Sequence, residues 1–294
     1  MPIAGAMPVA SVSSLFSREK LLQVARSLPA DLHVLSKLGE ILQDVNSELD
    51  EIAALLRRDV ALAARIVRIS NSPVFGGAGQ IASIEEAVNR VGFSEILKLV
   101  GTATAARMSE RNLEHYTLSA QTLRDNMLYG AFASEALARA AGADTRTAYT
   151  TGLLRPLGLM VLDRAGRGQV NGMLRFDAAR WPSYSAWEGS IFGVDNCEVT
   201  GLILDEWRFP RELGAALRAH YLSRAGDDAD PLACRLNLAN GLAERAGHAL
   251  PGETAWWTIH AEKLRQAGVG VDDLIPAAEA AEAAFQAALA ALAA

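Results

Sequence analysis

The side chains best suited to metal binding or nucleophilic catalysis lie far apart in this sequence. Four histidines have no ligand-like spacing, so each is expected to be structural or exposed: His33, His115, His248 and His260. The only cysteines are Cys197 and Cys234, too few for a disulfide framework or a cysteine-rich metal site. Neither cysteine neighbours a histidine in sequence, which favours buried apolar residues over nucleophiles. Local spacing alone therefore predicts no catalytic group.

Phosphate recognition is the second chemistry for which suitable residues are present. Asp59 is flanked by four basic residues: Arg57, Arg58, Arg65 and Arg68. Such a cluster is more often a solvated helix face than an anion or nucleic-acid site. The glycine-rich segment FGGAGQ (75–80) lacks the Lys-Ser/Thr pair of a P-loop and follows no predicted strand, so we expect a loop between helices. A net charge of −6 argues against bulk binding of nucleic acid, though not against a local basic patch.

An unusual pair of residues, Arg155 and Pro156, interrupts the most apolar run near the middle of the chain. The run, TRTAYTTGLLRPLGLMVLDR (145–164), has leucines on all sides and predicts a buried helix around which others pack. Pro156 lacks a backbone N–H, so the helix is expected to kink there. An unpaired guanidinium would be costly to bury, so Arg155 must reach solvent or meet a carboxylate.

Helical periodicity and capping signals continue along the rest of the chain. Residue spacing predicts that Asp59 caps a helix carrying Leu62, Ile66 and Ile69, which ends at Asn71, Ser72 and Pro73. Ser83 and Glu86 form a capping box for a short helix that ends at Gly92, and Ser94 is expected to cap the next. Further helices are expected with Leu35, Leu38 and Leu42 on one face, over about 116–141, over 231–247 and 254–267, and from about 273 with Phe285, Leu289 and Leu292 on one face. No strand of convincing length appears, so the fold class is predicted to be all-α.

Composition places the chain among soluble proteins. Residues 1–16 carry no charged side chain and are expected to form a flexible leader without the pattern of a secretory signal. No run reaches the roughly 20 apolar residues needed to span a membrane, so a cytoplasmic protein without a membrane partner is expected. Trp256 and Trp257 are expected to dock the C-terminal helices on the main body.

Three segments resemble the HDOD domain family. They are LPADLHVLSKLGEIL (28–42), DVALAARIVRISNSPVFG (59–76) and SIEEAVNRVGF (83–93), and the resemblance covers about residues 19–222. It implies an all-helical relative of the HD phosphohydrolases, found in bacterial signalling proteins and generally non-catalytic. Three parts are expected: the leader at 1–16, an HDOD domain at 17–222, and a helical extension at 223–294 that packs on it. The motif residues expected to be structural are Asp59, Asn71, Ser72, Ser83, Glu86 and Gly92.

The resemblance also indicates where HD metal ligands would lie. Such a site needs His and Asp side chains from several helices around one or two divalent ions. The corresponding positions here are Asp125, Arg155, Pro156, Asn196 and His220. Arginine has no free lone pair, proline has no side-chain ligand atom and asparagine offers only a neutral oxygen. We therefore expect no metal and no cofactor, and expect Arg155 to pair with an acid: Asp125 or Asp195, with Glu188 as a further candidate.

The sequence thus predicts a non-catalytic signalling module that presents a surface to a protein partner. Two alternatives remain open. One is a divergent metal-dependent phosphohydrolase acting on a nucleotide or cyclic dinucleotide. The other is a sensor that binds a nucleotide without hydrolysis, using Arg155 and the degenerate cleft.

Overall fold

Helices form all the extended regular structure in the described part of the chain, as predicted. The computed structural model describes residues 15–28, 34, 37, 49–71, 80–167, 175–224, 226–253 and 257–293, without the side chains of residues 49, 50 and 93. Within these ranges the one β-type contact is an isolated bridge between Leu113 and Leu118. The predicted helix around Leu35, Leu38 and Leu42, residues 75–79 of the FGGAGQ segment, and Ser72 lie outside the described residues. No described helix is both long enough and apolar enough to cross a membrane.

The folded body begins before the predicted end of the leader. Leu15 N–H donates to the Phe192 carbonyl at 2.9 Å. Phe16 is buried and stacks on the Phe192 ring, with ring centroids 5.6 Å apart. Helix α1 (Arg18–Arg26) follows, capped by Ser17. The leader boundary at residue 16 was therefore wrong at its end, because an aromatic side chain draws residues 15 and 16 into the core.

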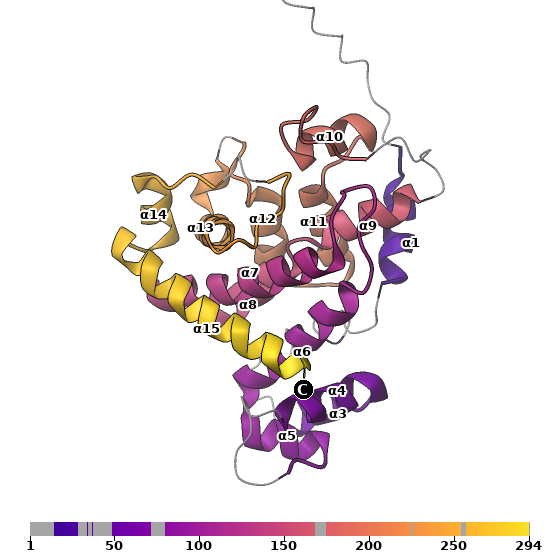
Figure 1. Ribbon diagram of the computed structural model, residues 1–294, viewed down its shortest axis with the longest axis vertical. Coiled ribbons are helices and arrows are strands. Elements are labelled where there is room, and N and C mark those ends of the chain that lie inside the picture. The colour runs from indigo at the N-terminus through magenta and orange to yellow at the C-terminus, as the bar shows by residue number, and fades with distance from the viewer. Residues whose placement is uncertain are drawn as a thin grey trace, which may run out of the picture.

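Four helices from the N-terminal half pack together at the lower end of Figure 1. They are α3 (Leu49–Leu56), α4 (Val60–Ser70), α5 (Ile84–Val91) and α6 (Phe93–Met108). The predicted apolar face of α4 is buried, since Leu62, Ile66 and Ile69 are all inaccessible to solvent. These helices form a bundle whose inner faces are aliphatic.

Both predicted ends of α4 are confirmed. Asp59 Oδ1 accepts a hydrogen bond from Leu62 N–H at 2.9 Å. At the other end of α4, the Asn71 side chain exchanges two hydrogen bonds with the backbone of Ile81, each at 2.8 Å. Asn71 therefore ends one helix and also holds the chain that leads into the next.

Helix α5 has its predicted cap, but α6 does not. Ser83 Oγ accepts from Glu86 N–H at 3.1 Å, and the Glu86 carboxylate accepts from Ala82 N–H at 3.0 Å. Gly92 ends α5, as predicted, with a φ of 83°. The structure starts α6 at residue 93, so Ser94 lies inside the helix and does not cap it. Because a glycine can end one helix and start the next without a loop, no capping side chain is needed here.

The long central helix also begins later than predicted. Helix α7 (Ala120–Ala140) is capped by Ser119. Residues before it, including Tyr116, form a tight turn in which Leu113 and Leu118 exchange backbone hydrogen bonds at 2.9 and 3.1 Å. Helix α7 packs against α8 (Thr145–Leu154), and both lie at the centre of the molecule.

The apolar run at 145–164 is buried, and it forms two helices separated at Arg155 and Pro156. Helix α8 ends at Leu154, and α9 (Leu157–Gly166) begins after the proline. The predicted kink is thus a complete break. Gly158 at the start of α9 lies against the first residue of the helix that begins at Asn196, where an added Cβ would be 2.0 Å from the Asn196 carbonyl oxygen. Only glycine allows the two helices to approach this closely.

The second half of the chain encloses α9 and α7. Helices α10 (Tyr184–Ile191), α11 (Asn196–Glu206) and α12 (Arg211–Ala219) follow α9, and α11 packs on α9, α12 and α1. Helices α13 (Pro231–Arg245) and α15 (Leu274–Ala293) both pack on α7. In Figure 1, α15 crosses in front of the central helices and ends beside α6.

The helix predicted over 254–267 is shorter in the structure. Residues 254–256, including Trp256, lie outside the described residues, and 257–260 are not helical. Helix α14 (Ala261–Ala267) starts after His260, whose Nδ1 accepts from Lys263 N–H at 3.3 Å. Trp257 is buried and stacks near His220, with ring centroids 6.4 Å apart. This indole attaches the segment before α14 to the end of α12.

Candidate functional site

A guanidinium group is buried at the break between α8 and α9. Arg155 Nη1 donates to both carboxylate oxygens of Glu253, each at 2.7 Å, and 1% of either side chain is exposed. Arg155 Nη2 donates to the amide oxygen of Asn126 on α7. Burial alone would lower the pKa of Arg155, but the Glu253 carboxylate and smaller contributions from Tyr221 and Cys197 together outweigh burial, and the pKa is raised. Arg155 is therefore a fixed cation in a buried, charge-assisted pair.

A tight turn after α13 positions Glu253. Its N–H donates to the Leu250 carbonyl at 3.0 Å, and the preceding Gly252 carbonyl accepts from Tyr184 N–H at 2.9 Å. A Cβ at Gly252 would lie 2.2 Å from the Tyr184 ring. The turn can rest on α10 only because this residue is glycine, and this contact holds Glu253 in place beside the helix break.

A chain of buried hydrogen bonds continues from Glu253. Tyr221 O–H donates to Glu253 Oε1 at 2.6 Å, and Asn196 Nδ2 lies 3.3 Å from the Tyr221 hydroxyl oxygen. Asn196 donates to Glu188 Oε2 twice, from its backbone N–H and from Nδ2, each at 2.8 Å. Tyr116 O–H donates to Glu188 Oε1 at 2.6 Å. A network of buried polar side chains, each with its partners, rigidifies the elements that supply it.

Glu188 is the acid in this network without a neighbouring cation to neutralise it. Burial raises the pKa of Glu188 to about 8, more than the hydrogen bonds from Tyr116 and Asn196 lower it. The folded protein therefore holds the Glu188 proton to a higher pH than the unfolded chain does. This buried carboxyl contrasts with Glu253, which the Arg155 cation holds at 2.7 Å.

His220 and Cys197 meet beside the network but do not activate each other. Cys197 Sγ lies 3.6 Å from His220 Nδ1, and the same nitrogen lies 2.7 Å from the Leu217 carbonyl oxygen. Burial, together with the charge on Arg155, lowers the pKa of His220 to about 3. Burial also raises the pKa of the Cys197 thiol well above its usual value. A neutral imidazole beside a neutral thiol is a structural contact and not a nucleophile with its base.

Comparison with known families decides the relationship. A family model for the HDOD domain matches residues 28–223, two thirds of the chain. The chain belongs to the HDOD domain family. This confirms the resemblance carried by the three N-terminal segments. A protein of Treponema pallidum (strain Nichols) is 29% identical over 212 residues, which are 70% of this chain and 40% of that relative. The chain thus spans well under half the length of the relative it matches.

Solved structures of HDOD and related proteins share the fold. An HDOD domain protein of Geobacter sulfurreducens aligns with a TM-score of 0.67 at 20% identity, covering 94% of this chain and 98% of that one. A candidate phosphohydrolase of Shewanella amazonensis SB2B gives a TM-score of 0.66 at 22% identity, with coverage of 94% and 98%. A candidate signal transduction protein of Marinobacter aquaeolei VT8 gives 0.66 at 18% identity, with coverage of 95% and 68%. At these identities the likeness shows the all-α HD-like fold alone.

The prediction that Arg155 meets an acid is confirmed, but the predicted acids were wrong. Asp125 receives hydrogen bonds from Arg124 at 2.8 and 3.0 Å, and its neighbour Asn126 reaches Arg155 in its place. Asp195 caps α11 by accepting from Glu198 N–H at 2.9 Å. Glu188 binds Tyr116 and Asn196 and has no hydrogen bond to Arg155. Asp195 is occupied as the cap of α11. Asp125 precedes Asn126 by one position on α7 and therefore points in a different direction, away from Arg155.

The residues at the expected HD ligand positions do not fit a catalytic metal. Arg155 places a cation where a ligand would be needed, and the oxygens around it already accept its hydrogens. Pro156 contributes no donor atom. Asn196 is committed to Glu188 and Tyr221. In the described residues no group of three or more His, Cys, Asp or Glu side chains is arranged to hold a metal ion. We derive no metal-dependent step from this set.

Sequence reasoning missed Glu253, Asn126 and Tyr221. A signal for Glu253 was present, because it is a lone acid in the apolar stretch LPGETAWW (250–257), just as Arg155 is a lone cation among leucines. Two isolated charges of opposite sign in apolar surroundings are expected to pair, because either one would be costly to bury alone. Asn126 and Tyr221 carry no comparable signal, because their roles depend on how α7 and α12 are rotated.

The other chemistry-bearing residues are structural in the described part of the chain. Among the histidines, His33 lies outside the described residues, His115 N–H donates to Asp163 at 2.9 Å, and the His248 ring lies 5.0 Å from that of Tyr129. In the basic cluster, Arg57 pairs with Glu85 at 2.5 Å and Arg65 donates to the Ala103 carbonyl at 3.2 Å. Burial raises the pKa of Cys234 to about 11, which keeps it a thiol.

Proposed function

We propose that this HDOD protein is a non-catalytic regulatory module that acts by binding a protein partner. Family membership and the HD-like fold make it a relative of the HD phosphohydrolases. A signalling role is supported by one solved structure with this fold, which is a candidate signal transduction protein. The proposal requires a rigid scaffold without a reaction centre.

One observation carries the non-catalytic part of the proposal: the buried pair between Arg155 and Glu253. In an HD enzyme, side chains at such positions converge on a divalent ion that activates water. Here the converging groups are a guanidinium, a carboxylate and an amide with satisfied hydrogen bonds. The cation joins α8, α7 and the turn after α13, as a metal would join its ligands. In our proposal the residues at the positions of the HD metal site support the fold and do not catalyse a reaction.

The nucleotide-sensor alternative at the same place is disfavoured by burial. A ligand that used Arg155 would have to displace Glu253 from a contact in which only 1% of each side chain is exposed. Leaving that carboxylate buried and unpaired would be strongly unfavourable. The phosphohydrolase alternative has no comparable physical objection beyond the ligand set, so it is the one to test.

Metal analysis with an activity assay tests the non-catalytic proposal. Purified protein would be incubated with Mn²⁺, Fe²⁺ or Zn²⁺, desalted, and measured for bound metal and for hydrolysis of a generic phosphodiester and of cyclic dinucleotides. We expect neither stoichiometric metal nor turnover. The double variant Arg155→His/Pro156→Asp should also be inactive, because Asn196 still leaves the ligand set incomplete. Near-stoichiometric metal with metal-dependent turnover in the parent would overturn the proposal.

Crosslinking in the native host tests the protein-partner part. Chemical crosslinking followed by mass spectrometry on the tagged chain should recover one protein reproducibly, with crosslinks confined to one face. The isolated pair should then bind in purified form. If no purified candidate binds, the partner part of the proposal is wrong, whatever the metal analysis shows.

A further inference from the structure

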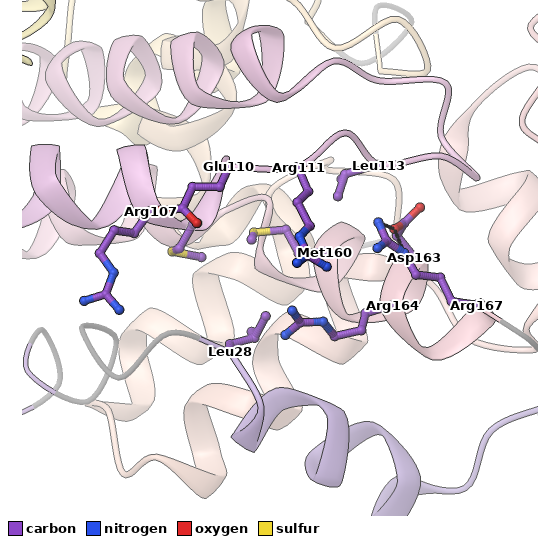
Figure 2. Close-up of a pocket in the computed structure, with 10 residues that line it drawn as sticks. Leu28, Arg107, Glu110, Arg111, Leu113, Met160, Asp163, Arg164 and Arg167 are labelled. Carbon is purple, nitrogen blue, oxygen red and sulfur yellow. Dashed lines mark hydrogen bonds and ion pairs between the residues drawn. The ribbon is translucent and has the colours of Figure 1, made fainter. Parts of the chain in front are cut away.

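A cleft of about 170 Å³ lies where the end of α1, the end of α6 and α9 meet (Figure 2). Six charged residues line it: Arg107, Glu110, Arg111, Asp163, Arg164 and Arg167. Four of the six are arginines, in a chain whose net charge is −6. So many guanidinium groups around one small cleft are unexpected for an acidic protein, and the bonds each one makes decide what the cleft can bind.

Asp163 neutralises only one of these arginines. Its Oδ2 accepts from Arg167 Nε at 3.1 Å and from Arg167 Nη2 at 2.9 Å. Its Oδ1 accepts from His115 N–H at 2.9 Å, and 1% of the side chain is exposed. Figure 2 shows Asp163 and Arg167 together at one end of the cleft. This pair forms a wall of the cleft with no charge left over.

Arg111 and Arg164 keep their charge available. Arg164 Nη1 donates to the Ser27 carbonyl at 2.8 Å and to its hydroxyl at 3.2 Å, and neither oxygen is charged. Among the described residues no hydrogen bond or ion pair joins Arg111 to the protein, and its side chain is exposed. Both guanidinium groups point toward the middle of the cleft in Figure 2. Two like charges facing one space repel each other until an anion lies between them.

Apart from Arg107, which pairs with Asp59 at 3.5 Å, and Glu110, the remainder of the cleft is apolar and adaptable. Met108 and Met160 line it together with two leucines, Leu28 and Leu113. Methionine side chains adjust to irregular shapes and make favourable contacts with rings. A cleft of this size is smaller than the roughly 300–1,000 Å³ of typical small-molecule sites, so it would enclose a phosphate and part of what is attached to it. The lining therefore suits an anion that carries a small organic group.

We propose that this cleft binds a small phosphate monoester, a mononucleotide being the representative case. The phosphate lies between Arg111 and Arg164, and the organic group lies against Met108 and Met160. The site is separate from the Arg155–Glu253 pair and does not depend on the proposed function above. It would give the module a small-molecule input at the junction of α1, α6 and α9.

Isothermal titration calorimetry on the full chain at low salt tests the proposal. The probes are AMP, ribose 5-phosphate, inorganic phosphate and adenosine. We expect AMP and ribose 5-phosphate to bind, inorganic phosphate to bind more weakly, and adenosine not to bind measurably. Arg111→Gln should weaken AMP binding by at least about tenfold, because it removes a charge-assisted contact. It should leave the melting temperature of the ligand-free protein unchanged, since Arg111 loses no hydrogen bond or ion pair to any residue that the structure describes.

Matched variants separate a specific site from general charge. Arg265→Gln removes an equal charge from α14. Arg265 pairs with Glu262, and in Figure 1 α14 lies on the side of the molecule away from α1 and α9. It should leave binding unchanged, whereas Arg164→Gln should weaken binding as Arg111→Gln does. The proposal is overturned if no phosphate ester binds at millimolar concentration, or if Arg111→Gln and Arg265→Gln behave alike. Adenosine binding as tightly as AMP would also overturn it, because the arginines would then play no part. Inorganic phosphate binding as tightly as AMP would remove the role given to the methionines.

Discussion

Arg155 and Glu253 are each a single charge in apolar surroundings, and each satisfies the other. Their two hydrogen bonds of 2.7 Å, with Asn126 on the second guanidinium nitrogen, leave neither group exposed. A buried pair of this kind adds little net stability compared with apolar residues of the same shape, but removing one partner leaves an uncompensated charge. The pair therefore adds little net stability, but neither residue can be replaced alone without a large loss.

Replacing one partner should cost much more than replacing both. Arg155→Leu leaves the Glu253 carboxylate buried without its cation, so we expect a loss of roughly 3–5 kcal/mol in unfolding free energy. Arg155→Leu/Glu253→Leu should recover a large part of that loss. Urea unfolding of the parent, both single variants and the double variant measures the coupling. Additive effects of the two single changes would show that the pair is not the energetic unit described here.

Glu188 makes stability depend on pH in the neutral to alkaline range. Its folded pKa of about 8 lies above the ordinary 4.5, so the folded state holds the proton more tightly than the unfolded state. This contribution is complete below about pH 4.5 and is lost as the pH rises through 8. His220 acts in the opposite direction, because its folded pKa of about 3 lies below 6.5 and its contribution is lost as the pH falls below 6.5.

Glu188→Gln should remove the alkaline part of this dependence. Glutamine keeps the shape and stays neutral, so it cannot lose a proton as the pH rises. Between pH 7 and 8.5, where His220 is almost neutral in both states, the parent should lose about 1 kcal/mol more unfolding free energy than the variant. Urea titrations at pH 7.0, 7.75 and 8.5 provide the comparison. Parallel curves for parent and variant would mean that Glu188 is ionised in the folded protein at neutral pH.

At the scale of single residues, the sequence showed which side chain needs a partner but not always which residue that partner is. That Arg155 required an acid followed from its leucine neighbours alone, since an unpaired buried charge is prohibitive. That the acid is Glu253 did not follow, because the two residues are 98 positions apart and meet only after α13 has folded onto α7. Pairings that depend on the rotation of packed helices leave little trace in local sequence.

At the scale of elements, the local signals were the reliable ones. The caps at Asp59 and Ser83 rest on side-chain-to-backbone hydrogen bonds within three residues, which the sequence encodes directly. The interruption at Pro156 rests on its missing N–H, and the predicted kink is a complete break. One local signal failed, because Gly92 starts α6 and leaves Ser94 inside the helix. The other errors came where tertiary packing overrides local preference. Examples are the tight turn that holds Tyr116 ahead of α7, and the non-helical residues 257–260 that Trp257 holds against His220.

The cap of α4 can be separated from its ion pair by two substitutions. Asp59 Oδ1 caps the helix, while Oδ2 lies 3.5 Å from Arg107 on α6. Asp59→Ala should cost about 1 kcal/mol, the usual value of an N-cap. Asp59→Asn keeps a capping oxygen and should cost only a few tenths, because a partly exposed ion pair contributes little. Thermal unfolding measures both. An Asp59→Ala variant that melts like the parent but no longer binds a protein partner would assign the residue to binding.

At the scale of the whole molecule, the segment after residue 222 completes the HDOD core. The family model ends at residue 223, yet Glu253 lies thirty residues beyond that end and neutralises a cation in the middle of the domain. Helix α15 adds a second contribution, because Phe285 packs between Tyr129 and His248 with ring centroids 5.8 and 4.5 Å away. The boundary predicted at 222/223 thus marks where the match to the family ends, while contacts of the buried core continue beyond it.

Two truncations test whether the C-terminal segment is needed for folding. A chain ending at Ser223 lacks Glu253, α13 and α15, so Arg155 would be buried without its acid and α7 would lose two of its covering helices. We expect it to lose cooperative unfolding in urea and to bind a dye specific for exposed apolar surface. A chain ending at Gly270 keeps α13 and Glu253 and loses the apolar cover from α15, together with the hydrogen bond from Tyr129 O–H to the Ala278 carbonyl at 3.4 Å. It should still unfold cooperatively, at a lower midpoint.

Adding Arg155→Leu to the shorter chain removes its stranded cation and should restore part of the lost structure by circular dichroism, whereas the same change in the longer chain should destabilise it. If the chain ending at Ser223 unfolds cooperatively with the midpoint of the full protein, the C-terminal segment is an appendage and the Arg155–Glu253 pair does not hold the domain together.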